Sequence, residues 1–305
     1  MPESQDIYDA ASRAKGWFAE HGKTTQIAFF GGSFTAIDKD YMISLLTAAR
    51  DVVQSYGLEG IRISTRPDKI DEEILKTLKD FGVTSIELGA QSMCDEVLTA
   101  NNRGHFSKDV IKASELIKEN DFELGLQMMT GLYKDTEKRA VETAKRLIAL
   151  RPRTIRIYPA LVLANTHLQE LMEKNMYKPQ TLDEAAELCG KLITKFEDKG
   201  IKVIRVGLHD EPSLKDGFIA GPYHPAFKEL CLSRNFLNRL LAELKSELAK
   251  SGEFRYNVLI NPRTYSVAVG QKRKNITELS AQGFQIQMKQ DSIISPGDFM
   301  IERAN

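Results

Sequence analysis

The chain has few cysteines and no excess charge of either sign, and both shortages exclude classes of protein. Its 305 residues include 3 cysteines, Cys94, Cys189 and Cys231, and no two of them share a short motif spacing. A disulfide framework is therefore not expected, whereas a reducing, cytoplasmic location is. Lys+Arg and Asp+Glu both number 42, so net charge gives no argument for binding to nucleic acid or to a membrane surface.

Long apolar runs are also missing. No stretch approaches the roughly 18 apolar residues that a membrane-spanning helix needs, and the first residues are polar and acidic, unlike a secretory signal. The sequence therefore predicts no membrane partner. Hydrophobic residues still make up 42% of the chain, which is enough for one large domain, or for a domain of about 250 residues with a small appendage.

The most informative stretch that is present covers residues 27–35. An apolar run ends there in Gly31 and Gly32, which are followed by the hydroxyl residues Ser33 and Thr35. The run is typical of a central strand covered on both faces. Two glycines at its carboxyl end let the backbone turn tightly and approach a ligand closely. The alternative is an ordinary strand-to-helix loop, and the rest of the chain must decide between them.

Short apolar runs alternate with longer amphipathic stretches. This order predicts parallel strands with right-handed crossovers, in a barrel or partial barrel rather than an open doubly wound sheet. No GxGxxG motif follows the first strand, which disfavours a Rossmann fold. We expect strands at 26–30, 60–64, 83–89, 122–129, 153–158 and 202–206, and helices near 39–55, 69–80, 92–100, 107–119, 136–149 and 181–199.

The regular alternation stops after Val206. We divide the chain into a barrel (1–215), a Gly/Pro-rich loop with a linking helix (216–252) and a small α+β unit (253–305). The Gly/Pro-rich residues begin earlier, over 207–225, and include His209 and His224, with Asp210 and Glu211 beside His209. We interpret these as surface loop residues because no zinc spacing is present. Beyond it we expect helix 226–250, strand 255–260, helix 264–269, turn 270–273, helix 274–281 and strand 284–289.

Polar groups recur where the predicted strands end. One such group is usually a helix cap, but glycine, amide, carboxylate, hydroxyl or arginine groups follow five successive strands, and this favours a shared site. The array suits a zwitterionic ligand. We assign Arg103 to a carboxylate, Glu87 and backbone carbonyls to an ammonium group, and Ser64 or Gln91 to hydroxyl groups.

Several motifs together resemble one family. They are "FFGGSFTAI", "ISTRPDKID", "IELGAQSMCDEVL", "NRGH" and "IRIYPALVLANTHLQELMEKNMYKP", which lie within residues 24–215. In combination they resemble the radical S-adenosylmethionine (SAM) enzymes. They are most similar to the catalytic subunit of Elongator and its bacterial relatives, and they share a pattern with the oxygen-independent coproporphyrinogen dehydrogenases.

The resemblance implies a partial (β/α)6 barrel that holds SAM and a [4Fe–4S] cluster and receives an electron from a donor protein. Gly31 and Gly32 match the motif whose backbone meets the SAM ammonium group, while Ser33 stands where many relatives have a carboxylate. Met128 and Tyr158 match strands that flank the adenine. The expected cofactor-binding residues are Gly31, Gly32, Ser33, Thr35, Ser64, Thr65, Glu87, Gln91, Arg103, Met128 and Tyr158.

The chain departs from the family at the cluster. The family holds its cluster with CxxxCxxC in the loop after the first barrel strand, and no such motif occurs here. The chain thus resembles a family member that lacks its first strand and cluster loop. We interpret Cys94 as a small core residue within a helix and predict no metal ligands. We also predict that this polypeptide alone is inactive in radical chemistry; the alternative function is a non-catalytic module that binds nucleic acid or protein.

The C-terminal unit resembles a KH module. In "YNVLINPRTYSVAVGQKRKNITELSAQGFQIQM", a turn of Gly270, Gln271, Lys272 and Arg273 separates two predicted helices. KH modules clamp a nucleic-acid backbone with a GXXG turn, but arginine replaces the second glycine here. Gly270, Lys272, Arg273 and Lys274 are the candidate RNA-binding residues, and a solvated turn in a small packing domain is the alternative.

Overall fold

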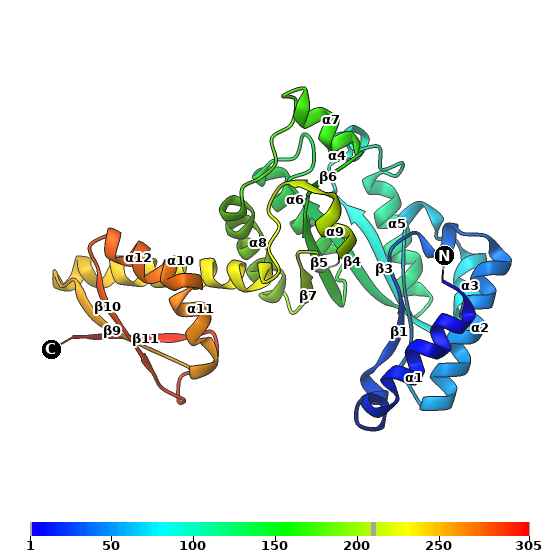
Figure 1. Ribbon diagram of the computed structural model, residues 1–305, viewed down its shortest axis with the longest axis horizontal. Helices are drawn as coiled ribbons and strands as arrows, with labels where there is room; N and C mark the ends of the chain where they lie inside the picture. The colour runs from blue at the N-terminus through cyan, green and yellow to red at the C-terminus, as the bar shows by residue number, and fades with distance from the viewer. Residues whose placement is uncertain (1, 209–211, 305) are drawn as a thin grey trace. The chain divides into compact units, whose positions relative to one another are not determined.

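A computed structural model describes residues 2–208 and 212–304 of the chain (Figure 1). The chain forms two compact units. The first comprises Met1–Tyr158 with Lys195–Arg205, and the second comprises Pro159–Thr194 with Val206–Asn305. Within the described residues, no helix combines the length and apolar character that crossing a bilayer requires.

The main sheet is a curled half-barrel of six parallel strands, as the sequence predicted. Its strand order follows the chain, β1-β2-β3-β4-β5-β7, so each crossover leads to the next strand in space. All six predicted strands are present, each within two residues of its expected ends. They are β1 (Gln26–Phe29), β2 (Gly60–Thr65), β3 (Val83–Gln91), β4 (Glu123–Thr130), β5 (Thr154–Pro159) and β7 (Lys202–Val206).

Three helices of the first unit, α2 (Lys39–Tyr56), α3 (Glu72–Asp80) and α6 (Glu137–Ala149), begin at a side-chain cap and bury an apolar stripe. In α2, the Asp38 side chain accepts a hydrogen bond from the Tyr41 N–H, and the helix stops at Gly57, whose φ of 61° favours glycine. The other helices of this unit are α1 (Ser4–His21), α4 (Asp95–Ala100) and α5 (Ser107–Glu119).

Alternation along the strands separates an apolar face from a polar one. On β2, Ile61 and Ile63 are fully buried, whereas Arg62 between them is half-buried. On β4, an added Cβ at Gly125 would lie 3.4 Å from Glu87 Cγ and 3.5 Å from Arg62 NH1, so these three residues share one face. That polar face carries the candidate site.

The second unit contains a small mixed sheet. Its central strand β9 (Arg255–Ile260) is parallel to β10 (Gln285–Gln290) and antiparallel to β11 (Phe299–Arg303). The core of this unit joins Leu240 and Leu244 of α10 (Phe227–Ser251) to apolar residues of β9. The remaining elements are β6 (Val162–Leu163), β8 (Phe218–Ala220), α7 (His167–Glu173), α8 (Leu182–Glu197), α9 (Pro212–Gly217), α11 (Tyr265–Val269) and α12 (Lys274–Ala281).

The element order expected for the last fifty residues is confirmed up to β10. The third strand, β11, was not predicted. Its residues are at most half-buried, so they show no buried apolar run, and the strand is defined by its pairing with β9. The likeness of this unit to a KH module stays a prediction, as does the division of the chain at residues 215 and 252.

Candidate functional site

The loop after β1 is fixed by a cluster of hydroxyl groups. Ser33 Oγ lies 2.9 Å and Thr35 Oγ1 lies 2.6 Å from Thr65 Oγ1 at the end of β2. Thr65 is buried, so we interpret it as a residue that positions the loop. Gly31 has φ of 103°, and no atom lies within 4 Å of an added Cβ at either Gly31 or Gly32, so backbone there is open to a ligand.

Arg103 lies in the loop after α4 with an incomplete set of partners. Its NH2 group donates to the Met129 thioether sulfur at 3.0 Å, which is a weak acceptor, and its buried Nε has no hydrogen-bond partner among the described residues. Burial, and secondarily the charge of Arg66, lower the pKa of Arg103. A guanidinium held in this way fits a carboxylate, which would satisfy the free donors.

Glycine at position 104 makes this arrangement possible. Its φ is 70°, and an added Cβ would lie 2.8 Å from NH2 of Arg66. Arg66 itself is held by Asp68, with Nε at 2.8 Å from Oδ1. The glycine of the "NRGH" pattern is therefore explained locally, because φ of 70° favours glycine and the Arg66 guanidinium lies close beside it.

Gln91 sits at a bulge where β3 meets β4. It has φ of 61°, and its Oε1 accepts a hydrogen bond of 2.8 Å from Gln127 Nε2. Its own Nε2 lies 2.7 Å from the position of an added Cβ at Gly89. Gly125 and Gln127 both lie on the polar face of β4. The bulge turns the Gln91 amide onto this same face, where it meets Gln127.

Glu87 is paired within the chain. Its carboxylate pairs with Arg156 of β5, with Oε2 at 2.7 Å from Nε, and the side chains are 2% and 13% exposed. Arg156 thus balances the charge of Glu87, and a contact between Glu87 and a ligand ammonium group stays a prediction. Burial raises the pKa of Glu87, while the charges of Arg156 and Arg62 oppose this rise. The pair crosses over Gly125 of β4, where an added Cβ would enter the space beside Glu87.

Arg156 also links the two sides of the half-barrel. Its guanidinium lies 4.3 Å from the ring centroid of Phe30, directly after β1, and its NH1 lies 3.3 Å from the Tyr158 hydroxyl. Strands about 4.8 Å apart would place β1 and β5 about 19 Å apart in a flat sheet. The contact therefore depends on the curl of the sheet, and it brings predicted Tyr158 beside the loop of Gly31.

Two further predicted residues fall on opposite faces. Ser64 pairs in register with Glu87 and alternates with Thr65, which places it on the polar face. Met128 is fully buried on the other face of β4, with Leu124 and Leu126, so a direct contact with adenine is not supported. Met129 occupies the polar face in its place.

The expected cofactor-binding residues did not include Phe30, Gln127, Met129 or Arg156. A signal for Arg156 was present, because a charged residue stands between Ile155 and Ile157 in a strand, and both isoleucines are fully buried. Such alternation marks the face that is not packed under helices. The contacts Gln91–Gln127, Glu87–Arg156 and Phe30–Arg156 lie on one polar face of the half-barrel, and Arg156 connects β3 to the residue that follows β1.

The cysteines do not fit an iron–sulfur cluster. Cys94 is the N-cap of α4 and is half-buried, not a core residue within the helix as expected. Cys189 and Cys231 are fully buried, and their side chains are hydrogen-bonded to each other, which, with burial, raises the pKa of the Cys231 thiol. Across residues 2–208 and 212–304, no group of three or more His, Cys, Asp or Glu side chains could hold a metal ion.

In the second unit, the turn between α11 and α12 presents two cations that form no ion pair within residues 2–208 and 212–304. Lys272 and Arg273 are exposed at φ of 52° and 61°, whereas Lys274 Nζ lies 2.6 Å from Asp183 Oδ1. Gly270 is needed because an added Cβ would lie 2.9 Å from Asn275 Oδ1. Of the four candidate RNA-binding residues, only Lys272 and Arg273 therefore offer an uncommitted charge.

The histidines of the Gly/Pro-rich stretch do not form a described cluster. His209, Asp210 and Glu211 lie outside the described residues. His224 is half-buried, and its Nδ1 accepts a hydrogen bond of 3.1 Å from the Ala226 N–H. It is therefore a local structural residue before α10 rather than a fully exposed loop residue.

Comparison of the sequence with curated proteins finds relatives that are 27% and 28% identical to this chain over part of its length. A tRNA uridine(34) acetyltransferase of Methanocaldococcus jannaschii is 28% identical over 183 residues, which cover 53% of this chain and 34% of that protein. Human Elongator complex protein 3 is 27% identical over the same length and with the same coverage. The chain thus spans about a third of the length of these curated relatives.

The fold has a solved counterpart. The archaeal Methanocaldococcus infernus Elp3 with an N-terminal deletion shares the fold, with a TM-score of 0.64 and 22% identity, over 81% of this chain and 59% of that chain. Residues 6–147 match the radical SAM superfamily, and residues 152–238 match the radical SAM C-terminal domain. The chain belongs to the radical SAM superfamily.

Proposed function

We propose that the polar face of the half-barrel binds SAM and that the chain is part of a radical SAM enzyme of the Elongator-like group. The observation that carries this proposal is Arg103, a guanidinium beside the thioether of Met129 whose buried Nε has no hydrogen-bond partner in the part of the chain that the structure describes. A ligand carboxylate would complete its hydrogen bonds. Membership of the superfamily supports SAM as that ligand.

The chain's own residues have distinct parts in this binding. Arg103 would hold the carboxylate, and the open backbone at Gly31 and Gly32 would approach the ammonium group. Ser64 and Gln91 would meet the ribose hydroxyls. Thr65, Ser33 and Thr35 keep the glycine loop in place through their mutual hydrogen bonds.

Bound SAM supplies a 5′-deoxyadenosyl radical in this family, when a [4Fe–4S] cluster and an electron donor reduce it. Iron–sulfur ligation requires thiolates, and the described cysteines do not fit it: Cys189 and Cys231 are buried together and Cys94 caps α4. We therefore assign no cluster ligands in this polypeptide. A cytoplasmic location is proposed from the cysteine pattern alone.

This polypeptide alone is expected not to cleave SAM. Anaerobic reconstitution with iron and sulfide should give no cluster absorbance and no 5′-deoxyadenosine, because the thiolates needed to hold the cluster are lacking. Binding of S-adenosylhomocysteine to the same sample should persist and shows that the chain is folded. Formation of 5′-deoxyadenosine would contradict the prediction, while loss of S-adenosylhomocysteine binding would contradict the SAM site itself.

RNA is a second candidate ligand, favoured by exposed Lys272 and Arg273 and by relatives named for tRNA uridine(34). Fluorescence anisotropy with a structured RNA should show binding that weakens with salt. Lys272→Glu with Arg273→Glu should weaken it at least about 10-fold, since phosphate contacts are electrostatic. The matched control is Lys174→Glu with Lys245→Glu, two exposed lysines of the same unit. Equal affinities of the two double variants would remove this candidate.

A further inference from the structure

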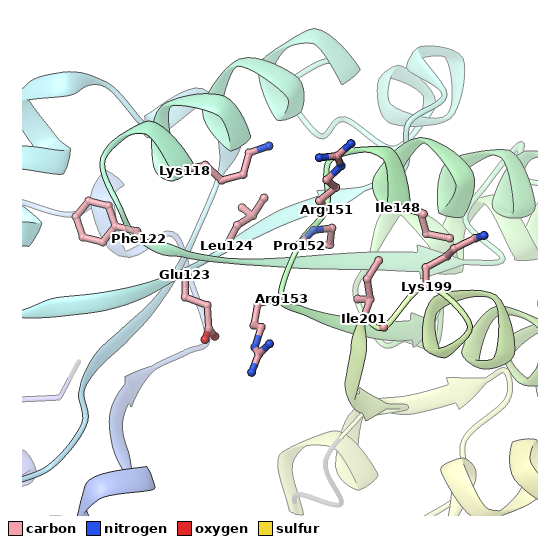
Figure 2. Close-up of a pocket in the computed structure, with 11 residues that line it drawn as sticks. Lys118, Phe122, Glu123, Leu124, Ile148, Arg151, Pro152, Arg153, Lys199 and Ile201 are labelled. Carbon is pink, nitrogen blue, oxygen red and sulfur yellow. The ribbon is translucent and has the colours of Figure 1, made fainter.

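A basic cavity lies at the end of the sheet opposite the candidate SAM site. It has a volume of about 660 Å³ and is formed where β4, β5 and β7 begin (Figure 2). In parallel α/β barrels, chemistry is placed at the carboxyl ends of strands. This cavity is at the amino ends, so it is separate from the candidate SAM site, which lies at the carboxyl ends of the strands. Its lining residues are Lys118, Phe122, Glu123, Leu124, Ile148, Arg151, Pro152, Arg153, Lys199, Gly200 and Ile201.

The cavity concentrates positive charge in a chain that has none in excess. Lys118, Arg151, Arg153 and Lys199 line it, and none of the four forms an ion pair within residues 2–208 and 212–304. The one carboxylate of the lining, Glu123, is already bound to Arg62 at 2.6 Å. Because Lys+Arg and Asp+Glu are equal over the chain, this local excess is not a consequence of composition.

The loop that carries two of these cations is held in place by its backbone. The Arg151 N–H donates to Ile148 O at 2.9 Å, and the Arg153 N–H donates to Leu124 O at 2.8 Å. Lys118 Nζ donates to Leu150 O at 3.2 Å, so it reaches across to the same loop, as Figure 2 shows. A fixed loop loses little conformational freedom when its side chains bind a ligand.

Arg151 occupies a backbone conformation that disfavours it. Its φ is 53°, directly after α6, at a position where helices usually end in glycine. A residue other than glycine there costs stability, and such strain is found where a side chain has a function. Basic residues near the carboxyl end of a helix stabilise the helix in general. This effect does not require the basic residue to adopt the left-handed backbone conformation that Arg151 has.

The lining also includes an apolar floor. Leu124, Pro152 and Ile201 are buried and Ile148 is half-buried. A cavity of this volume falls within the range of small-molecule sites, about 300–1,000 Å³. We propose that it binds an organic polyanion, a small molecule with two or more phosphate groups on an apolar or aromatic body. The phosphates would meet the cations and the body would cover the floor.

Calorimetric titration with ATP tests the proposal, with adenosine and inorganic triphosphate as partial probes. ATP should bind more tightly than either, and raising the salt concentration should weaken it. Equal affinity for inorganic triphosphate would overturn the organic part of the proposal. Displacement of ATP by a single-stranded RNA that binds more tightly would assign the surface to RNA and overturn it as well.

The variant Arg151→Gly separates binding from folding. Glycine suits φ of 53°, so the melting temperature should stay the same or rise, while ATP binding should fall about 10-fold. Adding Arg153→Glu should bring the loss to roughly 100-fold, because two charge-assisted contacts are removed. The matched control is Lys134→Gly, a cation at φ of 61° outside the cavity. Unchanged ATP affinity in Arg151→Gly with Arg153→Glu, or an equal loss in Lys134→Gly, would overturn the proposal.

Discussion

Replacing Arg103 by methionine is expected to weaken binding of S-adenosylhomocysteine by at least about 100-fold, because a charge-assisted carboxylate contact is lost in a partly buried site. The same change should not lower the free energy of unfolding. In the free chain, Nε of Arg103 is buried without a partner, and burying an unsatisfied charged group costs stability. Equilibrium dialysis and chemical denaturation measure the two effects.

The control for this variant is Arg50→Met, the same substitution on α2. Arg50 lies on α2, 4.9 Å from the ring centroid of Phe81, and is not one of the residues of the candidate site. It should leave S-adenosylhomocysteine binding unchanged. If Arg103→Met bound the ligand as well as Arg50→Met does, Arg103 would not hold the carboxylate.

Replacing Arg156 by methionine is expected to destabilise the protein by about 3–5 kcal/mol, because the buried carboxylate of Glu87 loses its partner. The double variant Glu87→Met with Arg156→Met should recover most of this loss, since removing both charges leaves no buried carboxylate. Denaturant unfolding of the single and double variants gives the coupling. The control pair is Arg139 and Glu96, which are 33% and 53% exposed. Arg139→Met should cost less than about 1 kcal/mol.

The loss in Arg156→Met should depend on pH with a defined sign. Burial already raises the pKa of Glu87, and removing Arg156 raises it further. A carboxyl group whose pKa is higher in the folded state binds more protons there than when unfolded, so stability falls as pH rises through that window. The deficit of Arg156→Met should therefore be smaller at about pH 5 than at about pH 8. A deficit that does not change with pH would show that Glu87 does not carry it.

The sequence placed most of the fold correctly because its signals are local. Each buried strand is a short apolar run, and helices such as α2 carry both a cap at Asp38 and a stop at Gly57. Strand β11 lacked such a signal, since tertiary pairing with β9 defines it. The hydroxyl cluster of Ser33, Thr35 and Thr65 could also be predicted from the sequence, because all three residues lie at or soon after the ends of predicted strands.

The sequence by itself determined the order of strands and helices, the parallel sheet and the family. It could do so because periodicity, helix caps and motif spacing depend only on residues that are close together in the chain. Which side chains face each other was decided by the curl and the bulge. The curl brings Arg156 to Phe30 across the half-barrel, and the bulge at Gln91 turns its amide toward Gln127. The pairing of Glu87 with Arg156 was not predicted, because Arg156 lies 69 residues away on β5. Pairing between charges so distant in sequence depends on three-dimensional distance alone, which no local pattern encodes.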